Sequence, residues 1–423
     1  MNRMMHRITL LLVCASGILL QGADARALIA EGNRLRLERQ FDEAERAYRR
    51  ALELSPGSLT PSIINNLGAL YFDRGNFTAA GEHWEKAAAM FAAGDSEQRL
   101  SRATTLVNLA ELHRSRGELD KAAALSRDAL AIREELTGPN SLAVAQSLNS
   151  IGTVLLDLHQ PAEAMRLLRR ALTIQETVRA PQGARFATTL HNLSEALRLN
   201  DEPEESRALA ERALKLRTEL FGRQHPDTAA TLSNLATLLE DSGPLDEALA
   251  MGLEALEIRR KLLPAGHPLT AVSLNNTGRL LMLQGRMEDA RRLLDEAAEL
   301  IRASSVNGRA LHAIILLNVA EWHLLRQETS AADPIYREAI GMFARNAPHH
   351  PRVAEAYSAF ARLLIMQGKL AAAEKMLTSA LATRRRFESE NSRPSMSLTR
   401  ALASLYRAQK RDTEAAKLER TFR

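Results

Sequence analysis

A carboxamide side chain recurs at a constant interval along most of this chain. The column holds one serine, Ser150, and six asparagines: Asn66, Asn108, Asn192, Asn234, Asn276 and Asn318. An amide both donates and accepts hydrogen bonds, so it can pair with the C=O and N–H of an extended peptide without reading its side chains. The column therefore favours recognition of polypeptide backbone. The alternative is that each amide bonds a neighbouring helix or loop and only holds the chain's own structure together.

Residue patterns for catalysis or metal binding are missing from the sequence. It contains no Gly-rich phosphate loop, no His-Glu-x-x-His, no G-x-S-x-G elbow and no cysteine cluster. His113 and His323 are separated by five intervals of the column, and we expect each to be a hydrogen-bonded core residue. The sequence thus predicts no catalytic residues, no metal site and no cofactor.

The elements that position the amides can be read from columns with the same period. Small residues follow the amides two places later, as at Gly68 and Ala110, and an alanine column begins at Ala80. Between these columns we expect a left-handed turn that ends one helix before the next begins, at Gly75, Gly117, Gly243, Gly285 and Gly368. The repeating unit is helix, turn, helix, which predicts an all-α solenoid of about ten such pairs.

Apolar residues in the first helix of each unit have helical spacing. One unit has Leu106, Leu109, Ala110 and His113, and another has Leu232, Leu235, Ala236 and Leu239. This stripe is expected to be buried.

These columns resemble the tetratricopeptide repeat (TPR) family, and in particular its 42-residue, kinesin-light-chain-like branch. The resemblance rests on runs such as Leu232-Ser233-Asn234-Leu235-Ala236 and on the His225-Pro226 and His267-Pro268 turns between units. It implies a right-handed α-solenoid whose first helices line a concave groove, with the asparagine column holding the backbone of a bound peptide. Residues one turn away would share that groove and select the peptide: Thr104, Glu111, Thr188, Glu195, Thr237, Asp241, Arg279 and Glu321.

The domain organisation predicted from these columns is simple. We expect a signal peptide over residues 1–25 and a continuous solenoid over 26–423. Within it, a short first repeat covers 27–56, the 42-residue repeats cover about 60–393, and a capping repeat covers 394–423.

The leader has the features of a secretory signal. Arg3 and Arg7 precede an apolar run from Ile8 to Leu20, and Ala23-Asp24-Ala25 provides an Ala-x-Ala cleavage site. The run is shorter than the ~20 residues that span a bilayer. Cys14, the single cysteine, could be a lipoprotein acylation site, but Val13 stands where a small residue is preferred. The sequence therefore favours export, to the periplasm or beyond a bacterial cell.

The charge balance does not indicate a nucleic-acid partner. The net charge is +5. It becomes +4 after cleavage, because Arg3, Arg7 and Asp24 leave with the leader. The basic run Arg384 to Arg386 is expected to be a solvated helix end.

The most favoured function is an exported scaffold that binds a peptide or a partner's exposed segment, and not an enzyme. The alternative is a membrane-tethered regulatory or sensor subunit of a separately encoded effector. In either case the expected partner is a protein or peptide, and membrane association requires a retained leader or acylation of Cys14.

Overall fold

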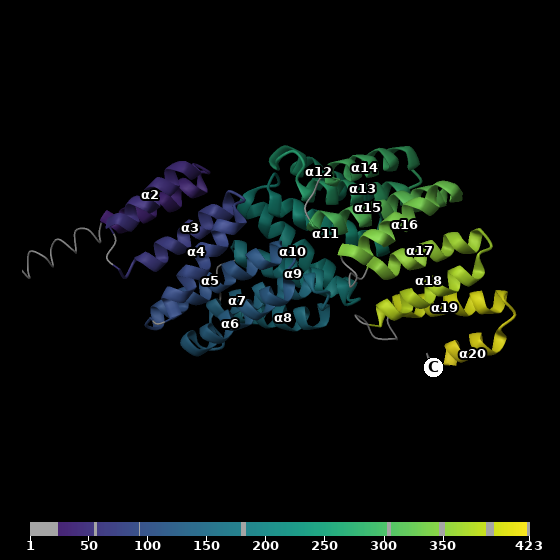
Figure 1. Ribbon diagram of the computed structural model, residues 1–423, viewed down its shortest axis with the longest axis horizontal. Coiled ribbons are helices and arrows are strands. Elements are labelled where there is room, and N and C mark those ends of the chain that lie inside the picture. The colour runs from purple at the N-terminus through teal and green to yellow at the C-terminus, as the bar shows by residue number, and fades with distance from the viewer. Residues whose placement is uncertain are drawn as a thin grey trace, which may run out of the picture. The chain divides into compact units, whose positions relative to one another are not determined.

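The regular structure of this chain is α-helical throughout the part that is described. The computed structural model describes residues 24–54, 57–92, 94–178, 183–302, 306–346, 352–385 and 393–420. Every regular element within these ranges is an α-helix, and the helices follow one another in pairs (Figure 1). The prediction of an all-α solenoid of about ten helix pairs is confirmed.

The chain divides into two compact units, and we describe each by itself. Unit 1 comprises Met1–Leu158 and Arg166–Ala180, and unit 2 comprises His159–Met165 and Pro181–Arg423. In unit 1 a helical stretch over residues 24–37 is followed by α2 (Phe41–Leu54), α3 (Thr60–Asp73), α4 (Phe77–Ala92), α5 (Ser96–Ser115), α6 (Leu119–Thr137) and α7 (Leu142–Asp157). Helix α8 (Pro161–Thr177) has residues in both units.

Unit 2 continues with six further pairs of helices in chain order. They are α9 (Ala184–Leu199), α10 (Pro203–Phe221), α11 (Pro226–Ser242), α12 (Leu245–Leu262), α13 (Pro268–Leu283), α14 (Met287–Ile301), α15 (Val306–Leu325), α16 (Thr329–Asn346), α17 (Arg352–Met366), α18 (Leu370–Arg384), α19 (Arg393–Ala408) and α20 (Asp412–Arg420).

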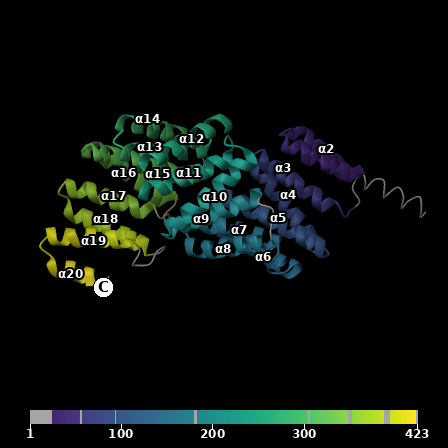
Figure 2. The same cartoon turned by 180° about the vertical axis from the view of Figure 1, so that it is seen from behind.

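The first helix of each pair, here called the A helix, packs on its own second helix (B helix) and on the A helix of the next pair. Contacts between successive A helices join α3, α5 and α7 in unit 1, and α9, α11, α13, α15 and α17 in unit 2. Figures 1 and 2 show these pairs lying side by side in chain order within each unit. The A helices thus form one layer of each unit, which we call its A-helix face.

Small side chains allow the two helices of a pair to approach closely. A Cβ added at Gly68 would lie 2.6 Å from the ring of Trp84, and one added at Gly278 would lie 3.0 Å from Leu294. The alanine column is fully buried, for example at Ala80 and Ala248. The interior is close-packed, so these columns fix the distance between A and B helices.

Left-handed backbone ends most A helices, as expected for the turn column. Gly75, Gly117, Gly285 and Gly368 have φ between 73° and 78°. The same conformation occurs without glycine at Arg39, His159, Asp201, Gln327 and Lys410.

The expectation of left-handed backbone at Gly243 is wrong. Its φ is −124°, which is extended backbone. Pro244 follows it, and a residue before proline is pushed towards extended conformations by the proline ring.

The His-Pro turns begin A helices. The Nδ1 atom of His225 accepts the main-chain N–H of Asp227 at 3.2 Å, and that of His267 accepts the N–H of Leu269 at 3.1 Å. Each histidine satisfies an N–H that would otherwise lack a partner at the helix start. The His-Pro turns between units therefore also cap the helices that follow them.

Candidate functional site

Two adjoining cavities open on the A-helix face of unit 2. The smaller has a volume of about 200 Å³ and is lined by Arg279, Ile314, Leu317, Asn318, Glu321, Arg352, Glu355 and Arg362. The larger, of about 460 Å³, is lined by Ala354, Glu355, Ser358, Ala359, Arg362, Arg384, Ser397 and Leu398. Glu355 and Arg362 belong to both linings, so the two cavities form one hollow over α13, α15, α17 and α19.

Three residues predicted to bind peptide meet in this hollow. Arg279, Asn318 and Glu321 come from α13 and α15, and all three line the smaller cavity. Their positions follow from the repeat, since Glu321 lies one helical turn after Asn318 on the same face. The structure therefore brings together the C-terminal members of the predicted set.

Two residues that line the hollow form ion pairs with the preceding A helix. Arg279 Nη2 lies 2.5 Å from Glu240 Oε2, and Arg362 Nη2 lies 2.8 Å from Glu321 Oε2. The hydroxyl of Tyr336 donates to the same Glu321 oxygen at 2.9 Å. Burial and the Glu321 charge raise the pKa of Tyr336, so this hydroxyl stays protonated.

Glu355 is the carboxylate at the centre of the hollow. Its side chain pairs with Arg352, and its Oε1 lies 3.4 Å from Arg384 Nη2. Burial alone would raise the pKa of Glu355, but the charges of Arg352, Arg384 and Arg279 outweigh that effect and lower it. Glu355 therefore remains ionised among arginines.

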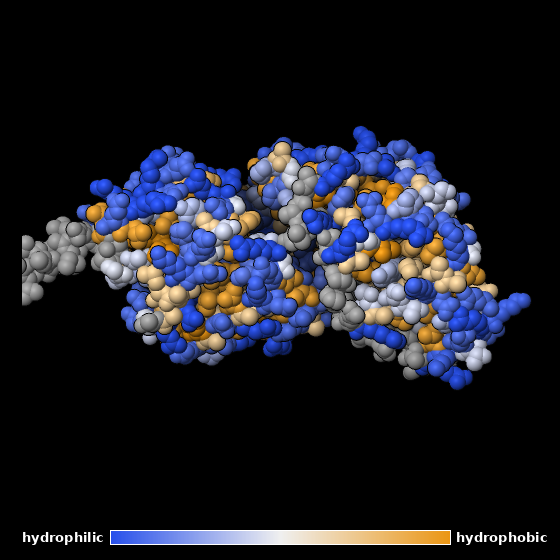
Figure 3. Space-filling model, in the orientation of Figure 1, coloured by the Kyte–Doolittle hydropathy of each residue, from blue (hydrophilic) through white to orange (hydrophobic). Residues whose placement is uncertain are grey.

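Large apolar side chains are exposed one turn beyond the charged residues. Leu283, Leu325 and Met366 occupy equivalent positions in three successive A helices, and 52%, 55% and 53% of their surfaces are exposed. On the face of the molecule seen in Figure 3, hydrophobic patches lie between hydrophilic surfaces in each unit. A ligand on this face would meet charged groups in the hollow and an apolar row beside them.

The asparagine column bonds neighbouring A helices. Asn318 Nδ2 donates to Oδ1 of Asn275 at 2.7 Å in unit 2, and Asn108 Nδ2 donates to Oδ1 of Asn65 at 3.4 Å in unit 1. Asn66 Nδ2 donates to Asn33 at 3.3 Å. This bonding is the structural role that was the alternative to ligand binding.

The same amides remain partly open to solvent. All six asparagines of the column are half-buried. Asn318 Oδ1 has no hydrogen-bond partner within the described residues, and Asn318 lines the smaller cavity. One amide can therefore bond its neighbour through nitrogen and present its oxygen to a ligand.

The remaining predicted residues do not line either cavity. Thr104 and Glu111 are exposed on α5 in unit 1, where Glu111 pairs with Arg114. Glu195 pairs with Arg198 on its own helix, α9. The other members lie on α9, α11 and α13; they are Thr188, Asn192, Asn234, Thr237 and Asn276. The hydroxyls of Thr188 and Thr237 donate to carbonyls of their own helices. The Asp241 side chain is outside the described part of the structure.

Four charged residues of the hollow were not predicted as site residues. Two of them are Arg362, which is the repeat equivalent of Glu321, and Glu355, which is the equivalent of Ile314. In their repeat the position of the asparagine column is Ala359, so the column from which the site was predicted ends before them. The Arg384 side chain is only 13% exposed and reaches Glu355, so the expectation of a solvated helix end is wrong for this residue.

The two histidines of the apolar stripe bond to the turns that follow them. His113 Nδ1 lies 3.0 Å from Glu118 Oε2, and His323 Nδ1 lies 2.7 Å from Glu328 Oε2. This confirms their expected hydrogen-bonded role.

Within the described residues, no three side chains of His, Cys, Asp or Glu gather closely enough to hold a metal ion. None of the described helices combines the length and apolar character needed to cross a bilayer.

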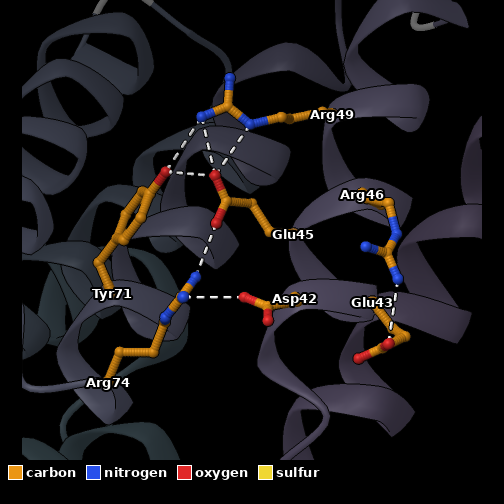
Figure 4. Close-up of polar contacts among 7 residues, drawn as sticks. All are labelled: Asp42, Glu43, Glu45, Arg46, Arg49, Tyr71 and Arg74. Atoms are coloured by element: carbon orange, nitrogen blue, oxygen red, sulfur yellow. Dashed lines mark hydrogen bonds and ion pairs between the residues drawn. The ribbon is translucent and has the colours of Figure 1, made fainter.

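A second charged cluster joins α2 and α3 in unit 1 (Figure 4). Glu45 accepts hydrogen bonds from Arg49, Tyr71 and Arg74, each at 2.8 Å, and Arg74 also pairs with Asp42 at 2.8 Å. Because the Glu45 carboxylate already has three donors, this cluster is best suited to holding the short first repeat against the second.

The family is shown by comparison with known proteins. Models described as "Tetratricopeptide repeat" match residues 25–58, 59–135, 101–177, 185–261, 229–303, 269–345 and 311–386. The chain belongs to the tetratricopeptide repeat family. No curated protein matches the chain.

Solved structures similar to this chain include the following three. A Rap protein complexed with Competence and Sporulation Factor has a TM-score of 0.54 at 12% identity, covering 94% of this chain and 99% of that one. The apo quorum sensor NprR from B. thuringiensis has a TM-score of 0.54 at 14% identity, covering 95% and 98%. A putative kinesin light chain of Podospora anserina with nearly identical TPR-like repeats has a TM-score of 0.40 at 21% identity, covering 48% and 95%. At these identities the likeness to the Rap protein and to NprR shows the fold alone.

Proposed function

We propose that this TPR protein is a binding scaffold whose A-helix face in unit 2 holds an extended peptide segment of a partner protein. The observation that carries the proposal is the hollow lined by Arg279, Asn318 and Glu321. It combines a free amide oxygen, charged side chains of both signs and a cavity on a face built from successive A helices.

Each feature of the hollow suits a polypeptide ligand. Asn318 Oδ1 can accept a main-chain N–H, and its orientation is held by the bond from Nδ2 to Asn275. Leu283, Leu325 and Met366, at equivalent positions of three successive A helices, offer apolar contacts beside the hollow. Hydrogen bonds to the backbone would supply affinity, while neighbouring side chains would supply specificity.

The comparisons support a binding role for the architecture. The Rap protein of similar fold has been solved in complex with Competence and Sporulation Factor. In unit 2 the charged groups of the hollow are tied into ion pairs between helices, an arrangement suited to docking a ligand and not to proton transfer. We therefore propose binding, not catalysis, as the activity of this chain.

Selection of peptides on the full chain would test this function. A phage library of random dodecapeptides panned on the wild-type protein should yield enriched binders. Arg362→Ala and Asn318→Ala should weaken their binding, because both residues line the smaller cavity.

A matched control is Arg260→Ala. Arg260 pairs with Glu296 at 2.6 Å between two B helices of unit 2, as Arg362 pairs with Glu321 between two A helices. If no peptide is enriched, or if Arg260→Ala weakens binding as much as Arg362→Ala, the peptide-binding proposal fails.

Export is the proposed location of this activity, with membrane tethering as the second candidate. Both rest on the N-terminal leader, which lies almost entirely outside the described residues. Mass spectrometry of the protein from its native source separates them. A chain beginning at Arg26 or Ala27 supports export, and an intact Met1 supports tethering.

A further inference from the structure

A buried arginine recurs near the C-terminal end of the B helices. Arg133, Arg217, Arg259 and Arg384 stand in the same column of the repeats. The first three are 4%, 4% and 5% exposed. Buried arginines are costly unless their charge is compensated, so a column of them needs an explanation.

In Arg133, Arg217 and Arg259, one edge of the guanidinium binds the next A helix. Arg259 Nη1 donates to the carbonyl of Leu269 at 3.1 Å and to Ser273 Oγ at 2.6 Å. Arg217 Nη1 donates to the carbonyl of Asp227 at 2.8 Å and to Thr231 Oγ1 at 2.7 Å. In both cases the carbonyl lies 10 residues after the arginine in the sequence, and the hydroxyl lies 14 residues after it.

The other edge of the guanidinium is directed to the A helix of its own repeat. Arg133 Nη2 donates to Thr104 Oγ1 at 3.2 Å in unit 1, and Arg384 Nη2 lies 3.4 Å from Glu355 Oε1 in unit 2. Both acceptors precede their arginine by 29 residues. Thr104 is exposed and Glu355 lines the hollow, so this edge opens on the A-helix face.

Arg217 and Arg259 lack the acceptor that Glu355 gives to Arg384. The residues that stand in the position of Glu355 in their repeats are Thr188 and Ala230. The Thr188 hydroxyl donates to Ala184 O of its own helix, and Ala230 has no polar side-chain atom. Within the described part of unit 2, no carboxylate side chain pairs with either guanidinium.

The lowered pKa values of Arg217 and Arg259 are consistent with the absence of a paired carboxylate. Burial lowers the pKa of Arg259 to about 10, and it lowers that of Arg217, where Asp227 offsets part of the effect. Burial and both arginines together lower the pKa of His191 to about 3, so this histidine stays neutral and adds no charge. The two guanidiniums form a buried positive region behind the A-helix face.

We propose that Arg217 and Arg259 are two subsites that take carboxylate side chains of the bound peptide. The inference rests on the proposed function and names the ligand class, a segment containing Asp or Glu. Glu355 shows that a carboxylate on the A-helix face can reach this edge of an arginine of the column. A ligand's carboxylate would occupy the equivalent place at Arg217 and Arg259 and form charge-assisted hydrogen bonds, which are stronger than bonds between neutral groups.

An internal carboxylate in the empty position provides the test. Ala230→Glu places an acid in the same position relative to Arg259 as Glu355 has relative to Arg384. It should raise the Tm of the chain by pairing with Arg259. It should also weaken binding of acidic peptides by roughly tenfold, because the subsite is filled. Thr188→Glu tests Arg217 in the same way and keeps the proposal testable if the first variant does not fold.

The matched control is Ala250→Glu, an identical change at an exposed position of α12. It alters the net charge equally but should leave both Tm and peptide affinity unchanged. Wild-type protein panned with random dodecapeptides should select sequences enriched in Asp and Glu. That enrichment should persist with Ala250→Glu and disappear with Ala230→Glu.

The outcomes separate this inference from the proposed function. Enriched peptides without an excess of Asp or Glu would overturn the carboxylate subsites and leave peptide binding standing. Equal loss of affinity in Ala230→Glu and Ala250→Glu would show a general charge effect and overturn the subsites as well. Failure to select any peptide would overturn both.

Discussion

Asn318 donates its side-chain N–H to Oδ1 of Asn275 over 2.7 Å, from one A helix to the preceding one. The acceptor stands one residue before the amide column, and Asn65 has the same place opposite Asn108 in unit 1. The bond fixes Asn318, which lines the smaller cavity, and leaves its Oδ1 without a hydrogen-bond partner within the described residues. Structural and ligand-binding roles of this amide are therefore compatible, since they use different atoms.

The Asn275–Asn318 bond should be measurable as a coupling. Asn275→Ala and Asn318→Ala are each expected to lower the free energy of unfolding by about 1 kcal/mol, and the double variant should lose less than the sum. Urea denaturation of the four proteins gives the coupling free energy. Strict additivity would show that the bond contributes nothing. Asn275→Ala should also weaken peptide binding, although Asn275 lines neither cavity, because Asn318 loses its fixed orientation.

The fold could be predicted from the sequence because the repeat makes each feature visible several times. Single columns of small and apolar residues indicated the helix pairs, and the backbone at Gly75 and Gly285 matched the expected turns. The prediction of left-handed backbone at Gly243 was wrong because it did not take the following residue, Pro244, into account. A local steric rule for the residue before proline outweighs the preference of glycine for left-handed backbone.

The residues of the candidate site could be predicted only in part, for two physical reasons. The amide column indicated Asn318, but its partner Asn275 depends on how far successive A helices rotate, which a period does not specify. Arg362 and Glu355 were missed because Ala359 replaces asparagine in their repeat, so the column on which the prediction was based ends at Asn318. The role of Arg384 was missed because a basic run at a helix end is usually solvated, whereas Glu355 draws this side chain inward.

Gly68→Ala should destabilise unit 1. A Cβ at this position would lie 2.6 Å from Cδ1 and Nε1 of Trp84, whose Nε1 donates to the carbonyl of Asn65 at 3.0 Å. The ring cannot shift without weakening that bond, so we expect a loss of about 1–3 kcal/mol in the free energy of unfolding. Gly57→Ala is the control, because a Cβ there meets nothing within 4 Å. Equal stability of the two variants in urea denaturation would contradict the close approach of α3 and α4.

Gln327→Gly should stabilise unit 2. Gln327 has φ of 61°, where a side chain costs roughly 1–2 kcal/mol relative to glycine. Part of that gain is offset by the greater backbone freedom of glycine in the unfolded chain, so a net gain of about 0.5–1 kcal/mol is expected. The reverse change, Gly368→Gln, occupies the equivalent turn one repeat later, where φ is 73°, and should lower stability. Thermal melts that moved in the same direction for both variants would rule out this account.

The contribution of Glu45 to stability should depend on pH. Burial acts to raise the pKa of Glu45, but hydrogen bonds from Arg49 and Tyr71 and the charges of Arg49 and Arg74 lower it overall. A carboxylate whose pKa is lower in the folded chain stabilises fully above the unfolded value, and that stabilisation is lost as the pH falls through the folded value. Glu45→Gln should therefore lower Tm at pH 7, by an amount equivalent to about 1–2 kcal/mol, and the deficit should shrink below pH 4.

Glu43 provides the comparison within the same helix (Figure 4). It pairs with Arg46 at 3.0 Å, but both side chains are more than half exposed, so Glu43→Gln should change Tm little at either pH. Thermal melts of the wild type and both variants at pH 7 and pH 3.5 make the measurement. If the Glu45→Gln deficit is the same at both values, the carboxylate is not held by its three donors, and another contact must fix α2 against α3.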